Sequence, residues 1–283
     1  MTILVFGRNG QVAKELQAMS EVRALGHTEV DLLTPGAAKA AIADHAPSVV
    51  INAAAYTAVD KAEQDGKSAF RLNAEAPGEM ARACAKLDVP FVHISSDYVF
   101  NGSGSRPWLP DDATGPIGVY GRSKLAGEDA VRDAGGCYAI LRTSWVFSPH
   151  GSNFVKTMLR LSETRDTLSV VDDQIGGPTP ARAIATACLT IADQLTQDPN
   201  KSGTYHFSGA PDVSWHGFAQ EILARAGHKT AVSPIPTSAY PTPAARPLNS
   251  RLDCRSAEDV FGLLRPDWRM ALDHVLEELE ITT

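Results

Sequence analysis

The first half of the chain alternates between two patterns of hydrophobic and polar positions. Short apolar runs are separated by longer segments in which apolar residues recur every three or four positions. Continuous apolar runs are typical of strands buried on both faces of a parallel sheet, and the longer segments predict helices covering those faces. The expected strands are Thr2–Phe6, Val22–Leu25, Ser48–Ala53, Pro90–Ser95 and Cys137–Thr143, and the expected helices are Gln11–Ser20, Pro35–Asp44, Ser68–Leu87 and Tyr120–Val131. Thr34 is expected to cap the second helix, with Pro35 at its first position. The pattern therefore predicts an α/β protein with a doubly wound parallel sheet.

Beyond Trp145 this regular alternation ends. The proline-rich segment Ser233–Pro247 has little periodicity, so we expect a loop that crosses the surface or lines a cleft. The remaining expected elements are helices at Ser152–Glu163, Ala181–Leu195 and Trp215–Ala226 and extended segments at Leu168–Asp172 and Thr204–Ser208. The second half is therefore expected to be a smaller, mixed α/β unit.

A glycine turn, Gly7-Arg8-Asn9-Gly10, follows the first strand and leads directly into the first helix. Glycines let the backbone approach a pyrophosphate closely, and the N terminus of the helix stabilises its charge, so this context predicts a dinucleotide site in a Rossmann sheet. The residues expected at the cofactor are Gly7, Arg8, Asn9, Gly10, Gln11 and Val12 in the turn, Asp31 and Leu32 at the adenine, and Ala53, Ala54, Ala55, Tyr56 and Thr57 beside the middle of the dinucleotide. We expect residues 1–145 to form an NAD(P)-binding domain, with parts of 165–200 returning to it, and residues 146–283 to be mainly a substrate-binding domain.

The second strand ends at Gly26-His27, where an NAD enzyme usually has an acidic residue. Because no carboxylate is expected there, Arg8 in the turn is a candidate to meet the 2′-phosphate of NADPH. We therefore predict that NADPH is accepted at least as well as NADH.

Tyr120-x-x-x-Lys124 carries the candidate chemistry. Residues four apart on a helix share one face, so the phenol and the ammonium can converge, and a nearby cation favours the ionised phenol. The pair is expected to exchange a proton with a substrate oxygen, and Ser96, at the end of a strand, is expected to hydrogen-bond the same oxygen. This predicts hydride transfer to or from a carbonyl or hydroxyl carbon.

Composition restricts the partners. A formal net charge of -7 argues against binding nucleic acid or an anionic membrane. The cysteines Cys84, Cys137, Cys188 and Cys254 are far apart and lack metal-ligand spacing, so no metal site is expected. No leader or membrane-spanning run is recognisable, and a cytoplasmic protein is expected.

The chain resembles the extended short-chain dehydrogenase/reductase family over essentially its whole length. The matching motifs are Gly7-x-x-Gly10-Gln11-Val12, Asn52-Ala53-Ala54-Ala55-x-Thr57-Ala58-Val59-Asp60, Ser95-Ser96-Asp97-Tyr98-Val99-Phe100, Tyr120-Gly121-x-x-Lys124-x-x-Gly127-Glu128, Arg142-Thr143-Ser144-Trp145-Val146, Asp173-Gln174-x-Gly176-x-Pro178-Thr179 and Arg246-Pro247-x-Asn249-Ser250. The later motifs distinguish between members of this family, whereas the glycine turn does not.

The resemblance implies reduction, by NADPH or NADH, of the C4 ketone of dTDP-4-dehydro-β-L-rhamnose to dTDP-β-L-rhamnose. By analogy, Tyr120 donates the proton, Lys124 tunes Tyr120 and holds the nicotinamide ribose, and Ser96 orients the carbonyl. Substrate contacts are further implied for Asp97, for Trp145 as an apolar wall, and for Arg246 and Asn249 at the nucleotide end.

The sequence departs from the family at several positions. Tyr56 stands where histidine is frequent, and Ser96 where threonine is usual. Some members dimerise through magnesium held by three glutamates, and the matching positions are Glu15, Arg182 and Glu278. An arginine in a cation site is electrostatically implausible, so we predict no bound Mg²⁺ and, in any homodimer, direct pairing of Arg182 with carboxylates.

Two alternative functions stay open. Another nucleotide-sugar reductase, epimerase or dehydratase of the same family shares the fold and Tyr-x-x-x-Lys, although a dehydratase usually has Asp-Glu after the Ser/Thr, and here Tyr98 follows Asp97. A non-catalytic regulatory subunit is the other, with the related methionine adenosyltransferase β subunit as precedent.

Overall fold

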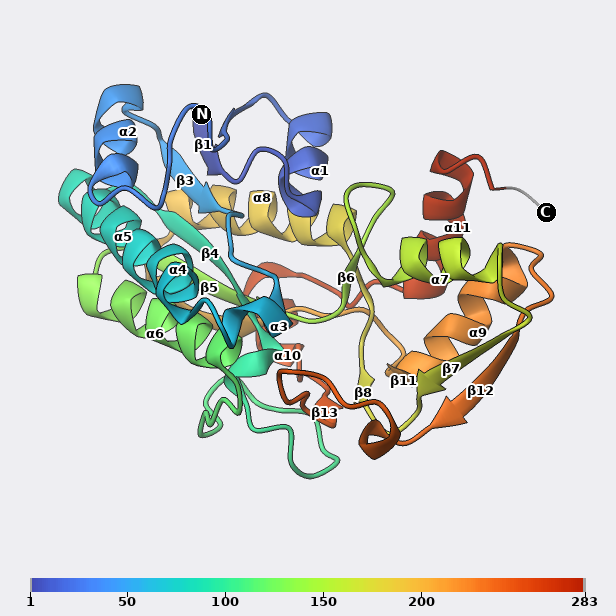
Figure 1. The fold of residues 1–283 in the computed structure, drawn as a ribbon. Coiled ribbons are helices and arrows are strands. Elements are labelled where there is room, and N and C mark those ends of the chain that lie inside the picture. Colours follow the sequence, from blue (N-terminus) through green and yellow to red (C-terminus); the bar gives the residue numbers. More distant parts are fainter. Residues whose placement is uncertain (1, 282–283) are drawn as a thin grey trace.

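The computed structural model describes residues 2–281 and contains a central sheet of six parallel strands in the order β10-β5-β4-β3-β1-β2 (Figure 1). The strands are β1 (Ile3–Phe6), β2 (Val22–Leu25), β3 (Val49–Asn52), β4 (Phe91–Ser96), β5 (Tyr138–Thr143) and β10 (Gly203–His206). From β1 the chain runs outward to β2 and then crosses to β3 on the other side of β1. Ligands of such sheets bind at the carboxyl ends of the strands where the strand order reverses. The predicted fold class is confirmed.

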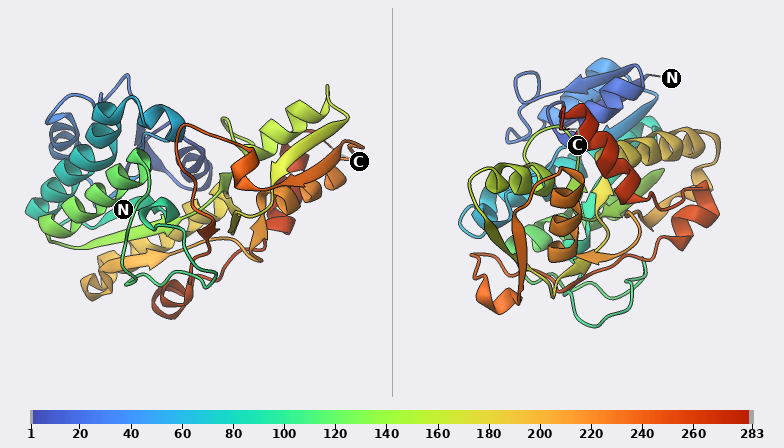
Figure 2. Two further views of the ribbon diagram at one scale, coloured as in Figure 1. Left: turned by 60° about the horizontal axis from the view of Figure 1, so that its bottom comes forward. Right: turned by 90° about the vertical axis from the view of Figure 1, so that its right-hand side faces the viewer.

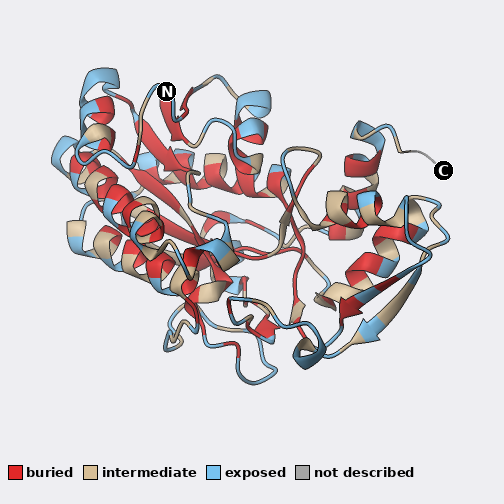
Figure 3. Ribbon diagram, viewed as in Figure 1, coloured by how far each residue is buried: buried red, intermediate tan, exposed pale blue. Residues whose placement is uncertain are grey.

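Helices cover both faces of this sheet because each strand alternates apolar side chains between the two faces. One apolar core joins Val5 and Ile51 to α1 (Gln11–Met19), α8 (Ala181–Gln197) and α10 (Arg255–Phe261). The other joins Leu4 and Val50 to α2 (Ala37–His45), α5 (Ala76–Leu87) and α6 (Val119–Ala134). Figure 3 shows the strands buried between exposed helix faces. The short helices α3 (Val59–Ala62) and α4 (Gly66–Phe70) precede α5.

A second group of elements packs around its own apolar core beside the carboxyl ends of the large sheet (Figure 2). Its helices are α7 (Phe154–Ser162), α9 (Trp215–Arg225) and α11 (Trp268–Glu278), and its parallel strand pair is β7 (Thr167–Val171) with β12 (Ala231–Ile235). Short strands connect the two groups: β6 (Val146–Phe147), β8 (Ile175–Gly176), β9 (Thr179–Pro180), β11 (Val213–Ser214) and β13 (Asn249–Ser250). Within residues 2–281, no helix has the length and apolar character needed to cross a bilayer.

Three predicted elements differ from the structure. Helix α2 begins at Ala37 after Gly36 in the left-handed conformation, so the predicted Thr34 cap is wrong. The helix predicted at Ser68–Leu87 is interrupted by a π-helical turn at Arg71–Glu75. The start of the predicted proline-rich loop is strand β12, in which Pro234 is accommodated because the strand lies at an edge of its pair.

Candidate active site

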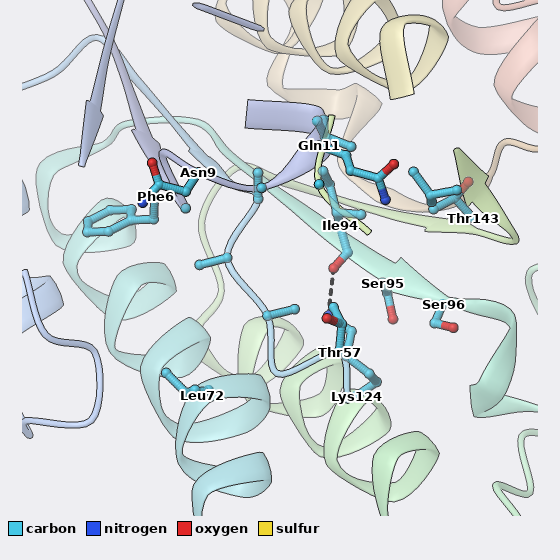
Figure 4. A pocket seen from close by; sticks show the side chains of 18 of the residues that line it. Phe6, Asn9, Gln11, Thr57, Leu72, Ile94, Ser95, Ser96, Lys124 and Thr143 are labelled. Atoms are coloured by element: carbon cyan, nitrogen blue, oxygen red, sulfur yellow. Dashed lines mark hydrogen bonds between the residues drawn. The ribbon is translucent and has the colours of Figure 1, made fainter. Parts of the chain in front are cut away.

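A cleft of about 890 Å³ lies at the carboxyl ends of the central strands. Figure 4 shows it between the β1–α1 turn, the end of β4 and helix α6. The predicted site residues that line it are Gly7, Arg8, Asn9, Gly10, Gln11, Val12, Asp31, Leu32, Ala53, Ala54, Ala55, Thr57, Ser96, Asp97, Tyr120, Lys124 and Trp145. The structure thus brings most of the candidate cofactor and catalytic residues to one place.

The glycine turn has the geometry of a close backbone approach. Gly7 has φ +106°, and a Cβ there would lie 2.7 Å from the backbone nitrogen of Ala54. Gly10 precedes α1 without any side-chain cap, so the first amides of the helix face the cleft unblocked by a side chain. Small residues and free helix amides are what a bound pyrophosphate requires, so the turn fits a dinucleotide.

A carboxylate does reach the end of β2, contrary to the expectation drawn from Gly26-His27. Glu29 folds back three residues, so that its Oε2 accepts hydrogen bonds from the Gly26 amide (3.0 Å) and from Thr28 Oγ1 (3.0 Å), while its Oε1 pairs with the Arg8 guanidinium. Sequence position alone could not reveal this, because the acidic residue lies beyond the turn. Arg8 is therefore paired, not free.

Ser96, Tyr120 and Lys124 converge from two elements. Ser96 ends β4, and Tyr120 and Lys124 lie in the first turns of α6. Lys124 is buried, and its Nζ donates a hydrogen bond to the Ile94 carbonyl at 2.7 Å, drawn in Figure 4. The predicted shared helix face is confirmed, because both side chains line the cleft.

Burial dominates the electrostatics of this pair. It raises the pKa of Tyr120 to about 12, with a hydrogen bond to Ser96 acting in the opposite direction. Burial lowers the pKa of Lys124 to about 8, opposed by the negative charge of Glu128. The expectation of a phenol made more acidic by Lys124 is therefore wrong for this structure, and Tyr120 holds its proton at neutral pH.

Asp97 is a buried carboxyl at the floor of the cleft. Its Oδ1 accepts a hydrogen bond from Ser96 Oγ at 3.0 Å, and its Oδ2 has no hydrogen-bond partner within residues 2–281. The Thr143 hydroxyl, which also lines the cleft, is likewise buried without a partner in that range. Buried polar atoms normally have partners, so these two are suited to a polar ligand.

Asp97→Asn is expected to stabilise the protein at pH 8 but not near pH 4. Burial raises the pKa of Asp97 to about 6, above its ordinary value of 3.8, despite hydrogen bonds from Ser250 and Ser96. The cost of ionising Asp97 in the folded state therefore appears as pH rises above about 4 and is complete above pH 6. It amounts to at most about 3 kcal/mol. Urea denaturation at both pH values measures it, with exposed Asp44→Asn as control, and an equal effect at both pH values would contradict the assignment.

Trp145 forms an aromatic wall with Trp215, which was not predicted from the sequence. Trp145 has a left-handed backbone (φ +50°), and its ring stacks on Trp215 with centroids 3.6 Å apart and planes at 11°. Trp215 begins α9 in the second group of elements and also lines the cleft. A Cβ on Gly176 would lie 2.9 Å from the Trp145 ring, so the glycine of the Asp173-Gln174-x-Gly176 motif makes room for this wall. The only sequence signal for Trp215 is an aromatic residue at a helix start.

Tyr56, Arg246 and Asn249 do not line the cleft. The Tyr56 hydroxyl donates to Asp65 at 3.3 Å. Arg246 forms an ion pair with Asp60 at 2.7 Å. The Asn249 side chain is buried, and its Nδ2 donates to the Arg106 carbonyl at 2.8 Å. In this structure these three side chains are engaged with the chain itself.

Asn73, in the π-helical turn, joins the loop after β3 to helix α6. Its Oδ1 accepts from the Tyr56 amide (2.8 Å) and its Nδ2 donates to the Tyr56 carbonyl (3.1 Å) and to Ser123 Oγ (2.9 Å). Ser123 Oγ in turn donates to the Tyr120 carbonyl at 2.7 Å. Asn73 was not predicted from the sequence, since a buried asparagine within a helical pattern has no distinctive spacing.

The three residues matching the family's magnesium ligands lie together. Arg182 approaches Glu278 with 3.9 Å between Nη1 and Oε1. Burial raises the pKa of Glu15, with the charges of His150 and Arg182 opposing and that of Glu278 reinforcing the rise. A guanidinium among these carboxylates does not fit a divalent cation, and no cluster of three or more His, Cys, Asp or Glu suited to a metal occurs in residues 2–281.

A Rossmann-type sheet, a glycine turn and a Tyr-x-x-x-Lys helix at one cleft define an oxidoreductase of the extended short-chain dehydrogenase/reductase class. The comparisons with known proteins narrow this class. A family model described as "RmlD substrate binding domain" matches residues 1–281, and the chain belongs to this family.

Two proteins named dTDP-4-dehydrorhamnose reductase illustrate the similarity. That of Sinorhizobium fredii is 44% identical, over 95% of this chain and 94% of the relative. That of Burkholderia thailandensis is 44% identical, over 99% of each. The crystal structure of a dTDP-4-dehydrorhamnose reductase from Clostridium acetobutylicum matches with TM-score 0.92 at 35% identity, covering 99% of this chain and 100% of that one. The Bacillus anthracis reductase, solved in complex with NADP, matches with TM-score 0.90 at 33% identity, covering 98% and 100%.

Proposed function

We propose that this chain reduces the C4 ketone of dTDP-4-dehydro-L-rhamnose to dTDP-L-rhamnose with NADPH or NADH, in nucleotide-sugar and polysaccharide biosynthesis. The observation that carries the proposal is the convergence of Ser96, Tyr120 and Lys124 beside the glycine turn in one cleft. Full-length relatives named for this reaction, one of them solved with NADP, support the choice of substrate and cofactor. NAD(P)H supplies the hydride when bound.

The chain's own residues supply the proton and the orientation. Tyr120 keeps its proton at neutral pH, so it is the donor to the oxygen that becomes a hydroxyl. Ser96 forms a hydrogen bond with Tyr120, which favours the phenolate left after proton transfer. This bond also places the Ser96 hydroxyl beside the substrate oxygen that receives the proton. Lys124, held by the Ile94 carbonyl, is a cation at the cofactor side of the cleft. The unpartnered Oδ2 of Asp97 is available to a sugar hydroxyl.

The remaining parts of the proposal concern organisation. Residues 1–145 form most of the cofactor-binding unit and residues 146–283 most of the substrate-binding unit, which is supported by the separate core around α7, α9 and α11. Of the stretch 165–200, α8 packs on the large sheet and β7 belongs to the second group. A cytoplasmic location and a homodimer stay predictions, as do nucleotide contacts of Arg246 and Asn249.

The purified chain with dTDP-4-dehydro-L-rhamnose tests the proposal. We expect one NAD(P)H oxidised per dTDP-L-rhamnose formed, with the product identified by NMR. A tightly retained cofactor that needs no replenishment would indicate the dehydratase or epimerase instead. Absence of ketosugar reduction together with a stable copurifying protein would indicate the regulatory subunit.

A further inference from the structure

The end of β2 carries an ion pair between Glu29 and Arg8, of which Arg8 lines the cleft. Glu29 is held by its own backbone as well as by its side chain, because its amide donates to the Gly26 carbonyl at 3.1 Å while its Oε2 accepts from the Gly26 amide. Hydrogen bonds from Gly26 and Thr28 hold its pKa below the ordinary value, so the carboxylate is charged at neutral pH. Its position is therefore set by the turn and not by Arg8 alone.

Arg8 approaches the same place from the glycine turn. Its backbone amide donates to the Leu25 carbonyl at 3.1 Å, and its carbonyl accepts from Gln17 at 2.9 Å. A Cβ on Gly26 would lie 3.2 Å from Glu29 Oε2 and 3.4 Å from the Arg8 Cβ. Both distances are tight, so the glycine at the end of β2 leaves the room in which the pair meets.

Arg8, Gly26 and His27 line the cleft where β2 ends. In a sheet of this topology, residues at that end of the second strand contact the adenosine ribose of the cofactor. A carboxylate there accepts a hydrogen bond from the 2′-hydroxyl of NADH, and an arginine binds the 2′-phosphate of NADPH. Here one ion pair contains both groups. We propose that the Arg8–Glu29 pair selects between the two cofactors, Glu29 favouring NADH and Arg8 favouring NADPH. The inference rests on the proposed use of NAD(P)H at this cleft.

The two partners act against each other toward a 2′-phosphate. A phosphomonoester carries a charge of about −1.5 to −2 near neutral pH, so Glu29 repels it and also engages the guanidinium that would bind it. Removing the carboxylate charge frees Arg8 for the phosphate and weakens the acceptor for a 2′-hydroxyl. The ratio of the two affinities, and not either affinity alone, is the quantity that the pair controls.

Glu29→Gln tests the proposal by direct titration of the full chain with NADPH and with NADH, followed by fluorescence and without sugar. We expect the Kd ratio to shift toward NADPH by about tenfold or more. Arg8→Met should shift it in the opposite direction by a similar factor. Glu21→Gln, an equal charge change on an exposed side chain before β2, should leave the ratio within about twofold of the unmodified chain.

A ratio that stays within twofold in Glu29→Gln or in Arg8→Met overturns the proposal, and so does an equal shift in Glu21→Gln, which would indicate long-range charge alone. If Glu29→Gln does not fold, the exposed Arg8→Met decides the matter. The titration uses no sugar and therefore does not depend on the proposed reaction. Loss of ketosugar turnover together with the expected Kd shifts would contradict the proposed reaction but not cofactor selection by the Arg8–Glu29 pair.

Discussion

Tyr120→Phe should lower kcat for the ketosugar by about 10²- to 10⁴-fold while leaving the Kd of NADPH within about threefold, since a positioned proton donor contributes a factor of this size. Phenylalanine keeps the ring, which packs edge-on against Tyr98 with centroids 5.3 Å apart, and removes only the hydroxyl that Ser96 contacts. Single-turnover oxidation of bound NADPH separates the chemical step from product release.

Tyr205→Phe is the matched control for that variant. It removes a phenol hydroxyl that donates to the Lys201 carbonyl at 2.7 Å, near the outer edge strand β10 and outside the lining of the cleft. We expect kcat to be unchanged. If Tyr120→Phe kept full kcat, another group would have to deliver the proton, and the assignment would fail.

Gly127→Ala is expected to reduce both stability and activity. A Cβ at this position would lie 2.0 Å from the Asn73 carbonyl oxygen, so α6 must move away from the π-helical turn. Overpacking of this kind costs about 1–3 kcal/mol, which corresponds to a Tm lower by roughly 2–5 °C in a chain of this size. Asn73 donates to Ser123, and Ser123 donates to the Tyr120 carbonyl, so a displacement of α6 also displaces Tyr120. We therefore expect kcat to fall at least about tenfold.

Gly66→Ala provides the comparison. A Cβ there meets only Val119 Cγ1 at 3.5 Å, an ordinary contact, so the same chemical change should leave Tm and kcat nearly unaltered. Scanning calorimetry and steady-state kinetics measure both variants. A Gly127→Ala protein with unchanged Tm would show that α6 tolerates displacement and that its close approach is not required.

The parts of the site that were predictable from sequence are those set by local spacing. The glycine turn and Tyr120-x-x-x-Lys124 each depend on one strand or helix, whose periodicity fixes where the side chains point. Glu29 was not predicted, because its carboxylate returns to the end of β2 through a turn whose shape the spacing does not specify. Trp215 was not predicted because its partner Trp145 is far away in the chain.

The pKa values of the site residues also could not be predicted from the sequence. Spacing correctly placed Tyr120 and Lys124 on one face, but their pKa values follow mainly from burial, which depends on the whole cleft. The ion pair of Arg246 with Asp60 was likewise not predictable from spacing, because Asp60 lies in a distant part of the chain. The π-helical turn at Arg71–Glu75 was likewise not predicted from the sequence.

The placement of β10 and α10 has a consequence for how the chain can be divided. The outer strand of the large sheet and part of its apolar cover come from residues 203–206 and 255–261, long after the chain has entered the second group of elements. A fragment ending at residue 145 would expose the face that α8 and α10 normally cover. Neither unit can therefore be excised with a single cut, and truncation at the apparent border should yield aggregating fragments where two independent modules would have stayed folded.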